Sequence, residues 1–171
     1  MEYSKEQAFV DTVQAKSHQL YRIAMSFLHS SQDAEDAVSD AIEATWKNLW
    51  RIRNEAVIPS YLIRCTINAA KMELRQRRRT EPIEPYQEFL IAPENGDSIA
   101  DYFAGIKEKD QLLLILKYQE DLPEAEIASI LRIPRGTVSS RLSRLLKRLR
   151  ADVLKEEIEG KPRLTMGGII L

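Results

Sequence analysis

The chain has 171 residues, of which 44% are hydrophobic and 30% charged, a composition that suits one medium or two small globular domains. Its single cysteine, Cys65, excludes an internal disulfide and a cysteine-based metal cluster, and it points to a reducing compartment. No apolar run approaches the ~20 residues that span a bilayer, and the first residues lack the apolar core of a signal peptide, so we expect a cytoplasmic protein.

The residue types favour helices, because only six glycines are present, strand-like alternation is scarce, and Leu, Ala, Glu, Arg and Lys dominate. The net charge is −1, but acidic and basic residues are concentrated in separate segments of the chain. Residues 33–43 carry five acids and no base, residues 64–79 carry six bases and one acid, and residues 80–106 carry no base. Such blocks suggest several different partners. The sequence therefore predicts an all-α chain with separate acidic and basic surfaces.

The first predicted helix begins after Ser4, whose spacing to Gln7 is that of a capping box, and ends near residues 29–31. Phe9, Leu20 and Phe27 recur on one face of it. Ser31 is predicted to cap the second helix.

The second predicted helix has an acidic outer face near its start, which complements the helix dipole there but has no basic partners four residues on. Toward its end lie Trp46 and Trp50, for which a core position and an exposed position are about equally expected. The acids of this face are Asp33, Glu35, Asp36 and Asp40.

A third predicted helix begins at Pro59 and ends in a cluster of arginines. Its spacing places Leu62, Cys65, Ala69 and either Met72 or Glu73 on one side, so Cys65 is expected to be a small core residue. Arginines can neutralise the phosphates of a nucleic acid, although a basic run alone is weakly specific.

Residues 81–96 contain prolines and acids without helical periodicity, which is typical of a linker. It is either a solvated spacer or a segment with a binding role. Helical periodicity resumes at Ser98, and residues 112–116 with Tyr118 are expected to pack under the next element.

Two short helices joined by a turn are predicted between Pro123 and Arg150, with Pro134 and Gly136 allowing the chain to turn. The second of them has a narrow apolar stripe, and no acid occurs between Arg132 and Arg150. Small hydroxyl residues let a helix lie deep against base edges, and arginine contacts both guanine and phosphate. A solvated basic face is the alternative. The candidate DNA-contacting residues are Thr137, Ser139, Ser140, Arg141, Ser143, Arg144, Lys147 and Arg148.

The segment Leu131–Arg141, L-x-I-P-x-G-T-V-x-S-R, resembles the C-terminal DNA-binding region of bacterial sigma factors of the extracytoplasmic-function group of the sigma-70 family. Residues 33–38, D-A-E-D-A-V, are similar to the helix that binds core RNA polymerase in that family, and the third predicted helix is similar to the one that reads and melts the −10 promoter element. The resemblance covers roughly residues 17 to 153. In two turns, Asp121 and Arg132 replace usual family glycines, so both turns are expected to be less relaxed.

The resemblance implies a sigma region 2-like domain at 1–79, a linker at 80–97, a region 4-like helix-turn-helix domain at 98–155, and a tail at 156–171 without a counterpart. Such a protein directs core RNA polymerase to promoters and assists DNA melting, needs no cofactor or metal, and is not an enzyme. The linker would thread a positively charged channel of the polymerase.

The resemblance also implies partners and site residues. Polymerase would be bound through the clamp helices of its largest subunit, which would meet Asp33, Glu35, Asp36 and Asp40, and through the flap of its second-largest subunit. Promoter DNA would be read at the −35 element by the helix-turn-helix, and an anti-sigma factor, which could itself be anchored in a membrane, would regulate the protein. The residues implied in −10 recognition and melting are Tyr61, Arg64, Asn68, Lys71, Arg75, Arg77 and Arg78.

Two other classes of protein fit the sequence less well. A helix-turn-helix regulator that binds DNA alone would need a receiver or ligand pocket, and no strand–helix alternation precedes Ser98. An enzyme would need a phosphate-cradling loop, a metal-ligand spacing or a nucleophile-base pair, and none of these patterns is found.

Overall fold

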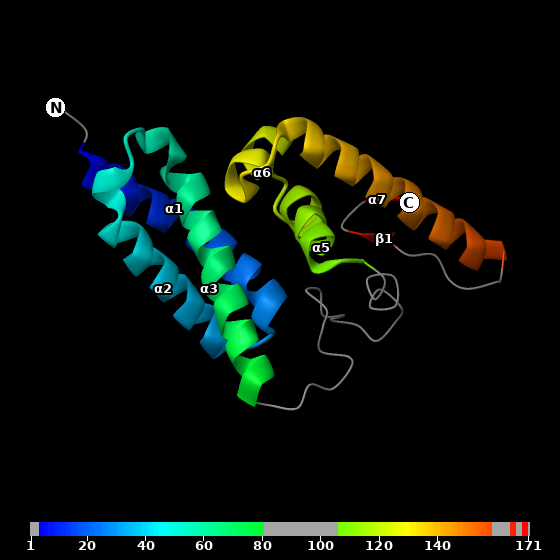
Figure 1. Ribbon diagram of the computed structural model, residues 1–171, viewed down its shortest axis with the longest axis horizontal. Coiled ribbons are helices and arrows are strands. Elements are labelled where there is room, and N and C mark those ends of the chain that lie inside the picture. Colours follow the sequence, from blue (N-terminus) through cyan, green and yellow to red (C-terminus); the bar gives the residue numbers. More distant parts are fainter. Residues whose placement is uncertain (1–3, 81–105, 159–164, 167–168, 171) are drawn as a thin grey trace. The chain divides into compact units, whose positions relative to one another are not determined.

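The computed structural model describes residues 4–80, 106–158, 165–166 and 169–170 (Figure 1). The chain divides into two compact units, residues 1–87 and 88–171. The described elements are helical except for β1 (Thr165–Met166) and β2 (Ile169–Ile170), which form a short antiparallel pair in the tail. The prediction of an all-α protein is confirmed. The predicted linker and the segment from Ser98 to residue 105 lie outside the described residues.

Helix α1 (Lys5–Leu28) begins as its sequence predicts. Ser4 is the N-cap, and its hydroxyl accepts a hydrogen bond from the backbone N–H of Gln7 at 3.2 Å. His29 follows the helix in the left-handed region with φ 51° and donates its N–H to the carbonyl of Met25. The sharp corner that results turns the chain directly into the next helix.

Helix α2 (Ser31–Lys47) is capped by Ser30, whose hydroxyl accepts from the N–H of Asp33 at 3.4 Å. The prediction that Ser31 caps it is therefore wrong by one residue. Ser31 is the first helical residue, and its hydroxyl accepts from the phenol of Tyr21 and donates to Glu35. The cap moved because His29 ends α1 so tightly that only Ser30 retains extended backbone between the helices.

Two short 3-10 turns, η1 (Leu49–Arg51) and η2 (Glu55–Val57), lead into α3 (Ile58–Thr80). In Figure 1, α2 and α3 lie side by side, with α1 packed against both. The core of this unit is apolar, as the hydrophobic spacing of the three helices predicts. Its fully buried large side chains include Leu20, Ile23, Phe27, Ile58, Leu62 and Ile63.

Cys65 is only partly buried, so the prediction that it is a core residue is wrong. The buried face of α3 contains Ile63, Thr66 and Ile67 as well as Leu62, which turns Cys65 and Met72 toward the edge of the helix. The predicted face was displaced because apolar residues occur on more than one side of α3, and spacing alone does not say which side meets α1.

The second unit begins its described part with α5 (Glu108–Leu114) and the π-helical turn η4 (Ile115–Gln119), in which residues 112–116 are buried as predicted. Tyr118 is partly buried beneath the following helices, and this burial raises the pKa of its phenol. Nearby Arg150 opposes that shift in pKa, whereas Glu124 adds to it. Asp121 then turns the chain with φ 50°.

Helices α6 (Glu124–Leu131) and α7 (Arg135–Ile158) form the predicted helix-turn-helix. Arg132 ends α6 with φ 54°, and the N–H of Ile133 bonds to the carbonyl of Ala128. Gly136 lies inside the first turn of α7, so the expectation that it makes the turn is wrong. Both positions with family glycines replaced, 121 and 132, are left-handed, which confirms the expected strain.

Candidate functional site

The exposed side of α7 is small and basic, and its other side is a buried stripe. Of the predicted stripe, four residues are buried beneath α5 and α6 and the fifth, Leu146, is half-buried. The four buried residues are Val138, Leu142, Leu145 and Leu149. Opposite them, between Ser139 and Arg148, the exposed side chains are small or basic, and the exposed large apolar residue of α7, Leu154, lies further along the helix. The predicted DNA-contacting residues Ser139, Ser140, Ser143, Arg144, Lys147 and Arg148 are exposed, and Thr137 and Arg141 are half-buried at the margins of this surface.

Several of these side chains are held against the helix. The hydroxyl of Ser140 donates to the carbonyl of Thr137 at 3.2 Å, and Nε of Arg144 donates to the carbonyl of Ser140 at 3.1 Å. Nε of Arg148 lies 3.8 Å from a carboxylate oxygen of Asp152. The base of the Arg144 guanidinium is thus fixed, while its terminal nitrogens remain available for a bidentate contact with a guanine.

A hollow of about 290 Å³ lies where α5 meets α7. Arg141, Arg144 and Arg148 line it from α7, and Lys107 and Lys109 line it from the start of α5, beside Asp110 and Leu145. The two lysines were not among the predicted site residues. Two lysines ahead of an apolar run carry no sequence signal, and only the packing of α5 on α7 brings them to the arginines.

The predicted acidic face lines a groove between α2 and α3. The groove has a volume of about 390 Å³, with Asp33, Asp36 and Asp40 on its α2 side. From α3 it is lined by Cys65, Asn68, Met72, Glu73 and Gln76. Asn68, predicted to read a base, and the acids, predicted to bind polymerase, therefore share one groove. Glu35 is exposed on α2 and is absent from the groove lining.

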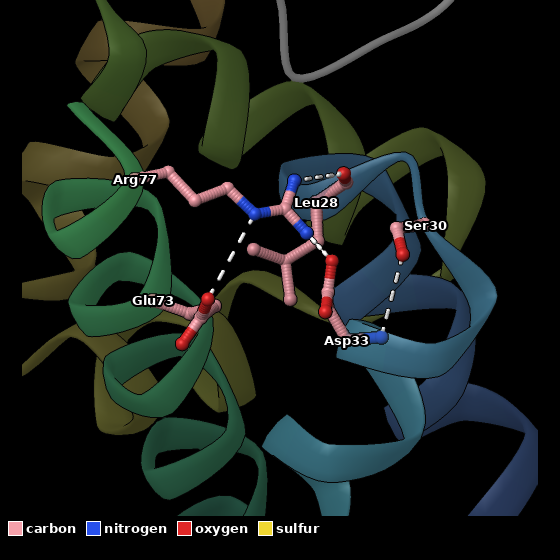
Figure 2. A network of polar contacts seen from close by, with 5 residues as sticks. All are labelled: Leu28, Ser30, Asp33, Glu73 and Arg77. Atoms are coloured by element: carbon pink, nitrogen blue, oxygen red, sulfur yellow. Dashed lines mark hydrogen bonds and ion pairs between the residues drawn. The ribbon is translucent and has the colours of Figure 1, made fainter. Parts of the chain in front are cut away.

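One acid of the groove is already paired. Figure 2 shows the guanidinium of Arg77, near the end of α3, in an ion pair with the carboxylate of Asp33 on α2. Arg77 also donates from Nη1 to the carbonyl of Leu28 at 3.1 Å, and its Nε lies 3.8 Å from the carboxylate of Glu73. We call these contacts the Arg77 brace. It joins the end of α1, the start of α2 and the end of α3.

The other predicted −10 residues lie along α3. The guanidinium of Arg64 stacks over the ring of Tyr61 at 4.8 Å, and Nζ of Lys71 lies 5.9 Å from the ring centre of Phe27. Tyr61 is half-buried, whereas Asn68 and Arg75 are exposed. The side chain of Arg78 lies outside the described residues.

Both tryptophans are exposed, which settles the open choice between core and surface. Trp46 is 50% and Trp50 72% exposed. Trp46 tilts against Phe9 with ring centroids 5.4 Å apart, and the guanidinium of Arg51 lies 4.8 Å above the Trp50 ring. The sequence did not single out the exposed position of the two tryptophans, because large aromatic residues are usually buried.

Within the described parts of the chain, no group of acidic, histidine or cysteine side chains has an arrangement that could hold a metal ion. Among the same residues, no helix combines the length and the apolar character that crossing a bilayer requires. What the structure offers is two kinds of charged surface: a small, basic helix face in one unit, and an acidic groove beside a basic helix end in the other.

Comparison with known proteins matches both units. The family model described as Sigma-70 region 2 matches residues 12–80, and the one described as Sigma-70, region 4 matches residues 97–149. RNA polymerase sigma factor SigV of Bacillus subtilis (strain 168) is 29% identical over 143 residues, which cover 81% of this chain and 86% of the relative. The ECF RNA polymerase sigma factor SigW of the same organism is 24% identical over 168 residues, covering 86% and 90%.

Two solved structures share the fold. One is the sigma factor RpoE in complex with the anti-sigma factor NepR from Bartonella quintana, with a TM-score of 0.62, 21% identity, and coverage of 84% of this chain and 94% of that one. The other is CnrH in complex with the cytosolic domain of CnrY, with a TM-score of 0.60, 18% identity, and coverage of 85% and 87%.

Proposed function

Because this chain belongs to the sigma-70 family, in its extracytoplasmic-function group, we propose that its two units read the two elements of a promoter separately. The chain is a sigma factor that acts in promoter-specific transcription initiation by RNA polymerase. A stand-alone regulator is not favoured, since the unit that precedes the helix-turn-helix is the region 2 unit. Members of the family are not enzymes, and we propose that this chain likewise acts by binding alone.

The second unit is assigned to the −35 element. The observation that carries this assignment is the exposed face of α7, where hydroxyls and arginines stand opposite a buried stripe. Ser139, Ser140, Ser143 and Arg144 would lie against base edges, because small side chains let the helix approach the floor of the major groove. The remaining members of the set, Thr137, Arg141, Lys147 and Arg148, would lie nearer the backbone.

The first unit is assigned to core polymerase and the −10 element. Asp36 and Asp40 are exposed on α2 and would meet basic residues on the clamp helices of the largest subunit. Asn68 and Arg75, exposed on α3, would contact a base edge and a backbone phosphate. The roles of Tyr61, Arg64 and Lys71 in the same element would be stacking and charge neutralisation.

An anti-sigma factor is proposed as a third partner, because one structural relative, the sigma factor RpoE, is bound to the anti-sigma factor NepR, and the other, CnrH, is likewise bound to a second protein, the cytosolic domain of CnrY. Core polymerase and promoter DNA lie in the cytoplasm, and we assign the protein to that compartment.

The assignment of α7 is tested with holoenzyme reconstituted from the full-length chain and core polymerase. Run-off transcription is measured on promoters that differ only at single positions of the −35 element. We expect Arg144→Ala to cost about 1–3 kcal/mol of binding free energy on the preferred promoter and to flatten the preference at one position. If Arg144→Ala weakens every promoter equally, the base-reading face lies elsewhere on the helix. Lys155→Ala, on an exposed position of the last described turns of α7, is the control.

A further inference from the structure

The hollow between α5 and α7 concentrates positive charge. Five cations from two separate segments line it, and the one acid among its lining residues is Asp110. Among the residues that the structure describes, Lys107, Lys109 and Arg141 have no ion-pair partner within 4 Å. The repulsion between the cations that line the hollow disfavours the folded state, and an anion bound in the hollow would reduce that repulsion. The fold therefore creates a place for an anion.

The position of the hollow on α7 indicates which anion. Successive residues of an α-helix are 100° apart, so Ser140 and Lys147 mark the centre of the exposed face of α7. On the same wheel Arg141 and Arg148 fall at one edge of that face, between its centre and the buried Leu145. A helix whose exposed face enters the major groove has the sugar-phosphate strands along its edges. The hollow thus faces the place where a strand would pass.

The start of α5 is held at this edge by internal contacts. The side-chain amide of Gln111 donates to the carbonyl of Ile106 at 2.8 Å, and both residues are buried. The N–H of Gln111 bonds to the carbonyl of Lys107 at 3.0 Å, and Leu112 and Leu113 are buried beside it. The backbone that carries the two lysines is therefore fixed before any partner arrives, so little ordering entropy is lost on binding.

We propose that Lys107 and Lys109 form, with Arg141 and Arg148, a seat for the phosphate backbone of the −35 DNA, so that α5 shares in promoter binding. The proposal rests on the proposed function, because it requires that α7 enter the groove of that element. The seat recognises phosphate and carries no base preference. Asp110 also lines the hollow, and its carboxylate would repel a phosphate that comes close to it.

The test uses holoenzyme with the full-length chain and a duplex promoter, with binding measured across a range of salt concentrations. The variant Lys107→Gln/Lys109→Gln should weaken binding to all −35 sequences about equally. Each lost phosphate contact lowers the slope of log affinity against log salt by roughly 0.9, and the variant loses two such contacts. The ratio of wild-type affinity to variant affinity should therefore fall by roughly tenfold between 50 and 200 mM salt. Lys155→Gln, a lysine of the same unit outside the hollow, should match wild type.

A second promoter, truncated so that the −35 duplex is missing, separates the explanations. On this promoter the lysine variant and wild type should bind equally. If the variant is weaker on the truncated promoter as well, the lysines contact an acidic protein surface of the polymerase, and the phosphate seat is wrong. If the variant equals wild type on the full promoter, the seat is also wrong, while the role of α7 stands. If wild-type holoenzyme gains nothing from the −35 duplex, the proposed function of α7 itself fails.

Discussion

The Arg77 brace predicts that Asp33 and Arg77 act as one unit. Arg77 was expected to contact DNA and Asp33 to contact polymerase, yet their charges neutralise one another in this structure. Helix α1 has no basic residue in its last turn, so the Arg77 guanidinium supplies the cation that its terminal carbonyls favour, through its bond to Leu28. Removing either member should therefore loosen the same corner of the first unit.

The magnitude follows from the contacts. A hydrogen bond that involves a charged group stabilises a fold by about 1.5–3 kcal/mol, and a surface ion pair adds about 0–1 kcal/mol. The two side chains are 30% and 29% exposed, so solvent screening favours the lower part of these ranges. We expect Arg77→Gln to lower the free energy of unfolding by about 2 kcal/mol. Arg77→Lys should recover less than half, because one ammonium cannot replace the forked contact to a carbonyl and a carboxylate.

The assay is a double-mutant cycle with Arg77→Gln and Asp33→Asn in the full-length chain. Both tryptophans of the chain lie in the first unit, so urea unfolding followed by tryptophan fluorescence reports on that unit. A coupling free energy of about 0.5–1.5 kcal/mol is expected. In holoenzyme, permanganate footprinting of the opened promoter should show that Arg77→Gln adds little to the defect of Asp33→Asn. Additive effects on stability, together with full strand opening by Arg77→Lys, would refute the brace and favour a phosphate contact.

Asp36→Lys/Asp40→Lys should weaken binding to core polymerase in a competition assay without unfolding the chain, and unchanged affinity would remove these acids from the interface; Asp33 is left intact because its reversal would place a cation beside Arg77. Asn68→Ala should reduce preference at one base of the −10 element, measured by transcription from single-base promoter variants, whereas a uniform loss would mean a structural role. Arg132→Gly should raise the free energy of unfolding of the second unit by about 0.5–1 kcal/mol. The left-handed backbone costs a non-glycine residue about 1–2 kcal/mol, and glycine's greater freedom in the unfolded chain offsets part of that gain. A lower free energy of unfolding in chemical denaturation would contradict this. Burial raises the pKa of the Tyr118 phenol, so near and above pH 10 the phenol ionises more readily in the unfolded chain than in the folded one. The free energy of unfolding should therefore fall as the pH rises above about 10. Tyr118→Phe should make this decline less steep when unfolding is measured at a series of alkaline pH values.

Sequence patterns predicted the local features of the fold well. The cap at Ser4 and the stripe at Val138 and Leu142 were correct because capping and helical periodicity depend on residues a few positions apart. The cap of α2 was placed one residue late, and Gly136 was given a turn that Arg132 makes. Both errors arose where a non-glycine residue adopts left-handed backbone, which residue preferences do not anticipate.

Contacts between distant segments were beyond the sequence patterns. Nothing in the spacing of Asp33 and Arg77 indicates a pair, because the two residues meet only after α3 packs on α2. Lys107 and Lys109 were overlooked for the same reason, since their charges gain meaning only beside the arginines of α7. The family resemblance supplied candidate residues, and the structure shows which of them are neighbours.

The groove between α2 and α3 has a consequence for the order in which a transcription complex is assembled. Asn68 lies in the same groove as Asp36 and Asp40, so a DNA strand that approaches Asn68 in the free protein meets uncompensated negative charge. Cations of the polymerase that cover these acids would remove that barrier. With the proposed roles of Asn68 and these acids, promoter DNA would reach Asn68 only after polymerase has bound, and the sigma factor alone would bind promoters weakly.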